Sequence, residues 1–398
     1  MDYKKDFPIL NNDIIYFDNA ATTLKPQCVI DEVVDYYKSY SANAHRGDYK
    51  ISQIVDDKLN LARQKVKEFI NADEKEEIVF TSGATESLNI IIKGFLKKYL
   101  KSQDEILTTK AEHASLVLPL FNITKQNGAI VKYITLDDNL KVTLENVKKS
   151  ITNKTKAIVL SHVTNVLGDI RPIKEICYYA HKLGIIVIVD GAQSIPHEKV
   201  DVKDLDVDFL VFSAHKMLGP TGVGVLYGKE KYLRQVSPLI EGGGMNAFFD
   251  SLGNVEYKEL PEKLEAGTQN LAGILGFSKA IDYINSIGIE NIKQREIELK
   301  KYMIEKLSKL KNIIIYNKEV SNGIITFNVK DVFSQDVAAY LDKNNICVRV
   351  GNHCAKILSE VLGVKNTCRV SLYFYNTKEE IDKIVELLDN DNILYESL

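Results

Sequence analysis

The sequence predicts an α/β fold with a mostly parallel central sheet in a large domain and a smaller α+β domain. Short apolar runs recur up to about residue 285 and are separated by segments long enough for helices. The runs are continuous instead of alternating with polar residues, which is typical of strands buried on both faces of a parallel sheet. Beyond residue 285 the pattern changes to a long charged segment followed by mixed short strands.

The strands of the large domain are expected at the apolar runs, which span residues 77–80, 105–108, 157–160, 185–189, 209–212 and 223–226. Polar residues follow several of these runs directly. Ligands of such sheets collect at the carboxyl ends of the strands, so we expect the functional residues there.

The smaller domain is expected to contain a long helix over 289–310 and strands at 324–327, 346–350 and 368–374. The first fifteen residues are expected to join it, because the segment from Tyr16 onward leads toward the main sheet. The sequence therefore predicts a large domain of residues 16–285 and a small domain of residues 1–15 and 286–398.

Composition limits the partners. The 398 residues contain 51 Lys and Arg against 54 Asp and Glu, a formal net charge of -3, so a global basic field for nucleic acid or an anionic membrane is not expected. The first eight residues include several charged side chains and lack the apolar core of a secretory signal, and the sequence has no uninterrupted membrane span. We therefore expect a cytoplasmic protein. Five widely spaced cysteines without a CxxC pair predict neither a disulfide framework nor a metal site.

Lys216 is the first candidate for chemistry, because it follows the apolar strand at 209–212. An amine at the end of a buried strand loses hydration, which favours the neutral nucleophile that condenses with a carbonyl cofactor. The alternative is a lysine at a strand end that is merely solvated.

Asp190 ends the most hydrophobic run of the chain. A buried carboxylate is costly unless a cation or several donors balance it. The protonated pyridine nitrogen of pyridoxal 5'-phosphate (PLP) is one such cation, and this pairing keeps the cofactor ring an electron sink in PLP enzymes. The alternative is an Asp that caps the following helix.

Other polar residues at strand ends would complete a PLP site. The small residues of 81–87, with Ala84 and Thr85, would present N–H groups and a hydroxyl to a phosphate, although an ordinary capped helix start has the same pattern. Ser213 and His215 would share the phosphate. In addition, two amides, Asn165 and Gln193, would hydrogen-bond the phenolic oxygen of the cofactor ring.

Four segments together resemble the class V aminotransferase family, and more narrowly its group II cysteine desulfurases of the SufS and CsdA type. They are residues 161–168, 190–193, 213–222 and 265–268. The resemblance extends from about Tyr16 to Asn376. It implies a fold-type-I PLP-dependent transferase that forms a homodimer. It also implies that Lys216 holds PLP, Asp190 pairs with the pyridine nitrogen, His113 stacks on the ring and Thr268 reaches the phosphate in the partner subunit.

Cys354 decides the reaction that the resemblance implies. It lies in the segment 348–355 and would be the nucleophile that attacks the sulfur of L-cysteine, for which a thiolate is needed. L-Cysteine would become L-alanine, and the persulfide on Cys354 would pass to an acceptor protein for iron–sulfur cluster or thiocofactor assembly. Cys28, Cys177 and Cys347 are interpreted as inert buried cysteines.

Substrate recognition is also implied by the resemblance. Arg369 would grip the substrate carboxylate through a bidentate fork, with Arg349 as a second candidate. The full set of substrate-binding candidates is Arg369, Arg349, Asn165, Ala21, His45 and Arg46.

Five positions differ from the residues common in the group II enzymes: Leu116, Leu120, Lys356, Ile357 and Gln269. They leave the predicted PLP residues intact and bear on access to Cys354, and so on substrate and acceptor choice. The alternatives are a selenocysteine lyase, another amino-acid lyase or aminotransferase of the family, and a non-catalytic homologue that binds or regulates a partner. Cys354 argues against plain transamination.

Overall fold

The computed structural model describes residues 3–44, 47–390 and 392–393. Its main feature is a seven-stranded sheet with the order β2-β8-β7-β6-β5-β3-β4. The strands are β2 (Ile78–Thr81), β3 (Glu105–Thr108), β4 (Ile130–Tyr133), β5 (Thr155–Ser161), β6 (Ile186–Asp190), β7 (Phe209–Ser213) and β8 (Gly224–Gly228). Only β8 runs antiparallel to its neighbours, β2 and β7. The predicted mostly parallel sheet is therefore confirmed.

Every apolar run that predicted a strand of the large domain lies in this sheet, with bounds that differ by at most two residues. Only β4 lacked a prediction. It is an edge strand beside β3 and is partly exposed, so its sequence does not form a continuous apolar run. Edge strands of this kind need fewer apolar residues than the strands between them.

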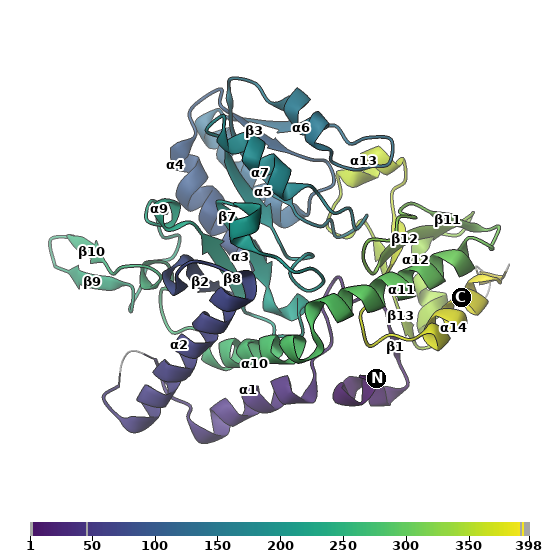
Figure 1. The fold of residues 1–398 in the computed structure, drawn as a ribbon, viewed down its shortest axis with the longest axis horizontal. Helices are drawn as coiled ribbons and strands as arrows, with labels where there is room; N and C mark the ends of the chain where they lie inside the picture. Colours follow the sequence, from purple (N-terminus) through teal and green to yellow (C-terminus); the bar gives the residue numbers. More distant parts are fainter. Residues whose placement is uncertain (1–2, 45–46, 391, 394–398) are drawn as a thin grey trace.

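Both faces of the sheet are buried under helices (Figure 1). Alternate residues of one strand enter different cores, so Ile158 packs in one cluster and Val159 in the other. The first face is covered by α1 (Gln27–Ser39), α2 (Lys50–Ile70), α6 (Leu144–Ser150), α7 (Ile173–His181), α8 (Val202–Leu205) and α10 (Leu271–Ile287). The second is covered by α3 (Ala84–Ile91), the π-helical η4 (Ile92–Leu96), α5 (Ala114–Asn127) and α9 (Glu230–Leu233).

A second, four-stranded antiparallel sheet with the order β11-β12-β15-β14 has its own core. Its elements are β11 (Ile313–Ile315), β12 (Ile324–Val329), β14 (Arg349–Gly351), β15 (Thr367–Ser371), α11 (Ile289–Leu307), α12 (Ser334–Asp342) and α14 (Lys378–Leu388). The strand expected over 346–350 is interrupted at Val348, because β13 (Ile346–Cys347) pairs with β1 (Ile15–Tyr16) while β14 pairs with β15. The strand expected over 368–374 ends at Ser371.

The amino-terminal segment contacts both the core of the large sheet and the smaller sheet. Asp18 forms a parallel bridge with Ser371, and Phe7 packs on Tyr283 and Phe374. The helix α10 continues to Ile287, two residues beyond the predicted end of the large domain. The division into residues 16–285 and residues 1–15 with 286–398 stays a prediction.

The remaining elements are short. They are η1 (Lys4–Asp6), η2 (Pro8–Asn12), η3 (Lys75–Glu77), α4 (Lys97–Tyr99), η5 (Ala214–Lys216), β9 (Asn246–Phe249), β10 (Val255–Tyr257), η6 (Glu262–Leu264) and α13 (Leu358–Leu362). The β9–β10 hairpin projects away from the rest of the molecule (Figure 1). In the part of the chain described by the structure, no helix is long and apolar enough to cross a membrane.

Candidate active site

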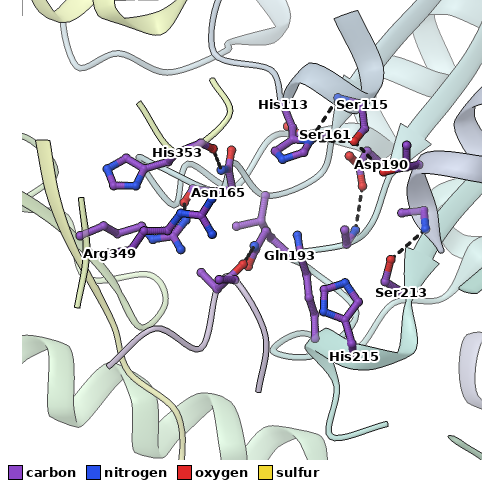
Figure 2. A pocket seen from close by; sticks show the side chains of 18 residues that line it. His113, Ser115, Ser161, Asn165, Asp190, Gln193, Ser213, His215, Arg349 and His353 are labelled. Atoms are coloured by element: carbon purple, nitrogen blue, oxygen red, sulfur yellow. Dashed lines mark hydrogen bonds between the residues drawn. The ribbon is translucent and has the colours of Figure 1, made fainter. Parts of the chain in front are cut away.

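A pocket at the carboxyl ends of β5, β6 and β7 gathers most of the predicted site residues (Figure 2). They come from both sheets and from the amino-terminal segment. Those that line the pocket are Ala21, Ala84, Thr85, His113, Asn165, Asp190, Gln193, Ser213, His215, Lys216, Arg349 and Arg369. Residues that are far apart in the sequence therefore share one cavity, as expected for strand ends that meet at one edge of a parallel sheet.

The other predicted residues lie outside this lining. Cys354 is exposed, and the Nη2 group of Arg349 donates to its Sγ atom at 3.7 Å, which places the thiol beside the pocket. Thr268 lines a second pocket, together with Ser82 and Gln269. The predictions for His45 and Arg46 lie outside the described residues.

Ala20, which the family resemblance implied together with Ala21, also lines the pocket, and further lining residues were not predicted from the sequence: Ser115, Ser161, Val163, Ala192 and His353. Each is within a few positions of a predicted residue, so the same motifs contained the signal. Ser115 is the most informative of them. Its hydroxyl lies 3.0 Å from His113 Nδ1 and 2.7 Å from Thr85 Oγ1, and so connects the helices α5 and α3.

Lys216 and Asp190 form the charged centre of the pocket. Lys216 follows β7 in the short helix η5, and burial lowers the pKa of its amine to about 8, against the opposing influence of Asp190. Asp190 ends β6, and its Oδ1 atom accepts the N–H of Ala192 at 2.9 Å. Burial raises the pKa of this carboxyl group while Lys216 lowers it. A carboxylate in this setting is suited to a cationic partner.

His113 is held as a neutral imidazole. It is the N-cap of α5, and its Nδ1 atom accepts the N–H of Ser115 at 3.2 Å. Burial lowers the pKa of His113 to about 4, and the positive charge of Lys216 acts in the same direction. A neutral ring on the wall of a PLP-sized pocket is suited to stacking on an aromatic cofactor.

The turn from β2 into α3 forms a cradle of small residues opposite β7. The N–H of Ala84 donates to Ser213 Oγ at 2.8 Å. Gly224 on β8 lies against this turn, since a Cβ atom added there would be 2.3 Å from the Cα of Gly83. The N–H groups of a helix start, with the Thr85 hydroxyl, favour an anion such as a phosphate. Burial lowers the pKa of the neighbouring His215 to about 4.

The two amides predicted to reach the cofactor ring also hold backbone. Asn165 Nδ2 donates to the carbonyl of His353 at 2.8 Å, and Gln193 Nε2 donates to the carbonyl of Ala20 at 2.7 Å. The Oε1 atom of Gln193 is buried and has no hydrogen-bond partner within the described ranges. Buried polar atoms are normally paired, so this atom indicates a missing donor in the pocket.

Arg369 on β15 is nearly inaccessible, with 1% of its surface exposed. Its Nη1 group donates to the carbonyl of Asn165 at 2.9 Å and its Nη2 group donates to Asp18 Oδ1 at 2.8 Å. Its Nε group has no hydrogen-bond partner in the described residues. Arg349 on β14 is directly opposite Arg369 in the strand register. Two guanidinium groups on one wall are suited to a carboxylate ligand.

The cysteines differ in their surroundings. Cys354 is exposed and next to Arg349, as is typical of a reactive thiol. Cys177 and Cys368 are buried, and burial raises the pKa of each thiol. The interpretation of Cys28 and Cys347 as buried was wrong, because both are half-buried, although burial still raises the pKa of both thiols.

The residues of the pocket fit PLP on structural grounds. The cofactor needs an anion-binding turn, a carboxylate for its ring nitrogen, a reactive amine and a donor or acceptor at the ring edge. The Ala84 turn, Asp190 and Lys216 provide the first three, and the unpaired Gln193 Oε1 atom lies in the same pocket.

A family model described as Aminotransferase class-V matches residues 15–384. The chain belongs to this family. The match covers both sheets and every described residue of the pocket, so the predicted resemblance to class V aminotransferases is confirmed.

Relatives within the class V family carry a more specific name. A probable cysteine desulfurase of Halalkalibacterium halodurans is 43% identical over 391 residues, which is 97% of this chain and 96% of the relative. The apo structure of a cysteine desulfurase from Thermococcus onnurineus has a TM-score of 0.93 at 38% identity, over 98% of this chain and 96% of that chain. The cysteine desulfurase CsdA of Escherichia coli has a TM-score of 0.92 at 33% identity, over 97% and 96%.

Proposed function

We propose that this protein is a PLP-dependent cysteine desulfurase that converts L-cysteine to L-alanine and leaves a persulfide on Cys354. The observation that carries the proposal is the exposed Cys354, whose sulfur accepts from Arg349 at the edge of the pocket that contains Lys216 and Asp190. The similarity to cysteine desulfurases over nearly the whole chain supports it.

PLP would be held by residues at the ends of the neighbouring strands β6 and β7 and at the start of α3. Ala84, Thr85, Ser213 and His215 would bind the phosphate, Asp190 would pair with the ring nitrogen and Lys216 would hold the aldehyde carbon. His113 would stack on the ring. When bound there, PLP supplies an electron sink next to the α-carbon of the substrate.

Lys216 would move the α-proton of the substrate. A lysine at its ordinary pKa is almost fully protonated at neutral pH, whereas a pKa of about 8 leaves a useful fraction of neutral amine. Asp190 stays close enough to favour the protonated form, so the amine can take a proton and return it. Arg369 and Arg349 would hold the substrate carboxylate and so fix the α-carbon near Lys216.

Cys354 would then take the sulfur. Its thiolate attacks the substrate sulfur, an S–S bond forms, and the carbon–sulfur bond breaks with its electron pair left on the carbon side. That carbon is protonated to give L-alanine, and the enzyme retains the persulfide. One thiol and one cysteine thus become one persulfide and one alanine, without an external oxidant or reductant. Arg349 Nη2 donates to this sulfur at 3.7 Å.

A sulfur-acceptor protein and a second copy of the chain complete the proposal. The persulfide on an exposed residue would pass to the acceptor for iron–sulfur cluster or thiocofactor assembly. Thr268 lines a different pocket from Lys216, so a role for it at a phosphate requires the partner subunit. The β9–β10 hairpin exposes Phe248, Phe249 and Leu252, which supports a homodimer in which these residues are covered.

The experiment measures alanine and persulfide from L-cysteine with PLP-loaded wild type, Cys354→Ala and Cys347→Ala. We expect a persulfide on the Cys354 peptide by mass spectrometry, loss of alanine formation in Cys354→Ala, and wild-type behaviour of Cys347→Ala, which removes a half-buried thiol. Full alanine formation by Cys354→Ala would contradict the proposal. The same assay with L-selenocysteine tests the alternative of a selenocysteine lyase.

A further inference from the structure

The turn that presents Lys216 is short and is closed by two backbone hydrogen bonds, from the N–H groups of Met217 and Gly219 to the carbonyl of Ala214, at 2.9 Å each. It consists of the three-residue helix η5 (Ala214–Lys216), after which Leu218 adopts a left-handed conformation with φ 68°. Short 3₁₀-helices have few hydrogen bonds of their own, so contacts from other parts of the chain must fix their orientation. The side-chain direction of Lys216 therefore depends on what holds the neighbouring peptide groups.

The carbonyl oxygen of His215, which belongs to the His215–Lys216 peptide group, is surrounded by donors from the amino-terminal segment. The Thr23 N–H lies 3.0 Å away, Thr22 Oγ1 3.0 Å and Lys25 Nζ 3.1 Å. Thr23 Oγ1 lies 3.2 Å from the same oxygen and accepts the N–H of Leu218 at 2.8 Å. Residues 22–25 thus hold the turn on both sides of Lys216.

Lys25 is the unusual member of this group. It is half-buried, and burial lowers the pKa of its amine to about 8. Its ammonium donates to His215 O, to Thr22 Oγ1 at 3.1 Å and to the carbonyl of Thr23. No carboxylate of the described chain forms a salt bridge with it. Partial burial of an ammonium group without a counter-ion is costly, and an apolar side chain could fill the same space without that cost.

Two roles are compatible with these contacts. Lys25 could simply attach the amino-terminal segment to the large sheet, or it could orient Lys216. The choice of acceptor favours the second role, because three of the six hydrogen bonds that the side chains of Thr22, Thr23 and Lys25 make in this cluster converge on one carbonyl, directly before Lys216. The hydrogen bond of Thr23 to Leu218 fixes the other end of the same turn.

We propose that Lys25, together with the hydroxyl of Thr22, is a positioning residue that fixes the His215–Lys216 peptide group and thereby aims the Lys216 amine into the pocket. The inference rests on the proposed function, in which Lys216 holds PLP. Lys25 itself does not line the pocket, so it acts through the backbone of His215.

The experiment compares wild type with Lys25→Met, Lys25→Arg and Thr22→Val. Lys58→Met is the matched control, because Lys58 on α2 is also half-buried but donates to Glu32 of α1 and to Tyr40 at the end of α1, and not to the turn of Lys216. The first readout is the dissociation constant of PLP for the apo-protein, followed by visible absorbance. The second is the rate at which acetic anhydride labels Lys216 in the apo-protein, measured by peptide mass spectrometry relative to exposed lysines.

We expect Lys25→Met to weaken PLP binding about tenfold, which corresponds to about 1.4 kcal/mol, and to change the labelling rate of Lys216. Lys25→Arg should restore part of both, because its guanidinium group can also donate to the His215 carbonyl. Lys58→Met should leave both at wild-type values. Thr22→Val, which removes one hydroxyl and keeps the shape of the side chain, should shift both readouts less and keeps the test valid if Lys25→Met does not fold.

Wild-type PLP affinity and wild-type labelling of Lys216 in Lys25→Met would overturn the inference, as would equal changes in Lys58→Met. A different result would contradict the proposed function, namely a wild-type protein that binds PLP but forms no alanine from L-cysteine. The labelling of Lys216 needs neither PLP nor cysteine, so it tests the positioning role in either case.

Discussion

Arg369 and Asp18 form an ion pair in the wall of the pocket, with 2.8 Å between Arg369 Nη2 and Asp18 Oδ1. Arg369 is 1% exposed and the Asp18 side chain 22%, so solvent screens the pair only in part. Asp18 belongs to the amino-terminal segment, whereas Arg369 lies on β15. The pair, together with the carbonyl of Asn165, fixes the plane of the guanidinium group, whose buried Nε group has no hydrogen-bond partner in the described residues.

Asp18→Asn should therefore raise the KM for L-cysteine about tenfold, since a hydrogen bond between charged groups contributes about 1.5–3 kcal/mol. The kcat should change much less, because Asp18 touches Arg369 and not Lys216 or Cys354. Steady-state kinetics of the PLP-loaded enzyme measure both constants. Asp31→Asn is the control, because Asp31 occupies an exposed position of α1. An unchanged KM in Asp18→Asn would show that Arg369 is oriented without this pair.

Arg63→Met should be strongly destabilising. Arg63 on α2 binds both carboxylate oxygens of Glu265 at 2.8 Å, and Glu265 also accepts the N–H of Phe80 at 2.6 Å. Both side chains are 6% exposed, so the variant leaves a buried carboxylate unpaired, at a cost of about 3–5 kcal/mol. Urea unfolding measures the loss. Lys65 lies on the same helix as Arg63, and Lys65→Met, which breaks a more exposed pair with Asp282 of α10, should cost less than about 1 kcal/mol.

The sequence alone was sufficient to predict the elements whose local pattern of apolar and polar residues matches their burial in the fold. Strands between two layers of helices are continuous apolar runs, and the run at 185–189 is β6 of the central sheet. The edge strand β4 has no such run, because part of it faces solvent. The interruption at Val348 depends on two different partners, β1 and β15, which no local pattern encodes.

For the site, the strand ends and the family motifs predicted most of the residues that line the pocket. They did not predict the contacts that hold those residues in position. Asp18 and Lys25 lie in a segment with no apolar periodicity, and their importance depends on Arg369 and His215, about 350 and 190 positions away. Contacts between residues so far apart in the sequence can be recognised only in the folded structure. Thr268 differs from these residues, because a family motif predicted it, whereas its predicted role at the phosphate needs a second subunit.

His181 should make stability depend on pH. Its two ring nitrogens lie 2.8 Å from Asp206 Oδ2 and 2.9 Å from Asp208 Oδ2, and the hydrogen bond to Asp208 is the largest cause that raises the pKa of His181 above the ordinary 6.5. A raised pKa stabilises the folded state below the unfolded pKa, and this contribution is lost as pH rises through the folded pKa. His181→Gln should therefore lower the free energy of unfolding at about pH 5.5 and much less at about pH 9. Equal losses at both pH values in urea unfolding would contradict this assignment.

Lys300→Met should stabilise the protein. Lys300 on α11 is fully buried, and its amine has no hydrogen-bond partner in the described part of the chain. Burial lowers the pKa of Lys300 from 10.5 to about 7. At neutral pH and below, the folded state therefore bears the full destabilisation, because it must either bury a charged amine or release the proton that the amine holds in the unfolded chain. At about 1.4 kcal/mol per pKa unit, the upper bound on the gain from the apolar side chain is about 5 kcal/mol.

The gain should shrink as pH rises from about 7 toward 10.5, because the lysine of the unfolded chain then loses its proton as well. Urea unfolding at several pH values measures this trend. Lys301→Met is the matched control, since Lys301 is the exposed neighbour on the same helix and carries no desolvation cost. A gain that is independent of pH would mean that improved packing, and not the removal of a buried amine, stabilises Lys300→Met.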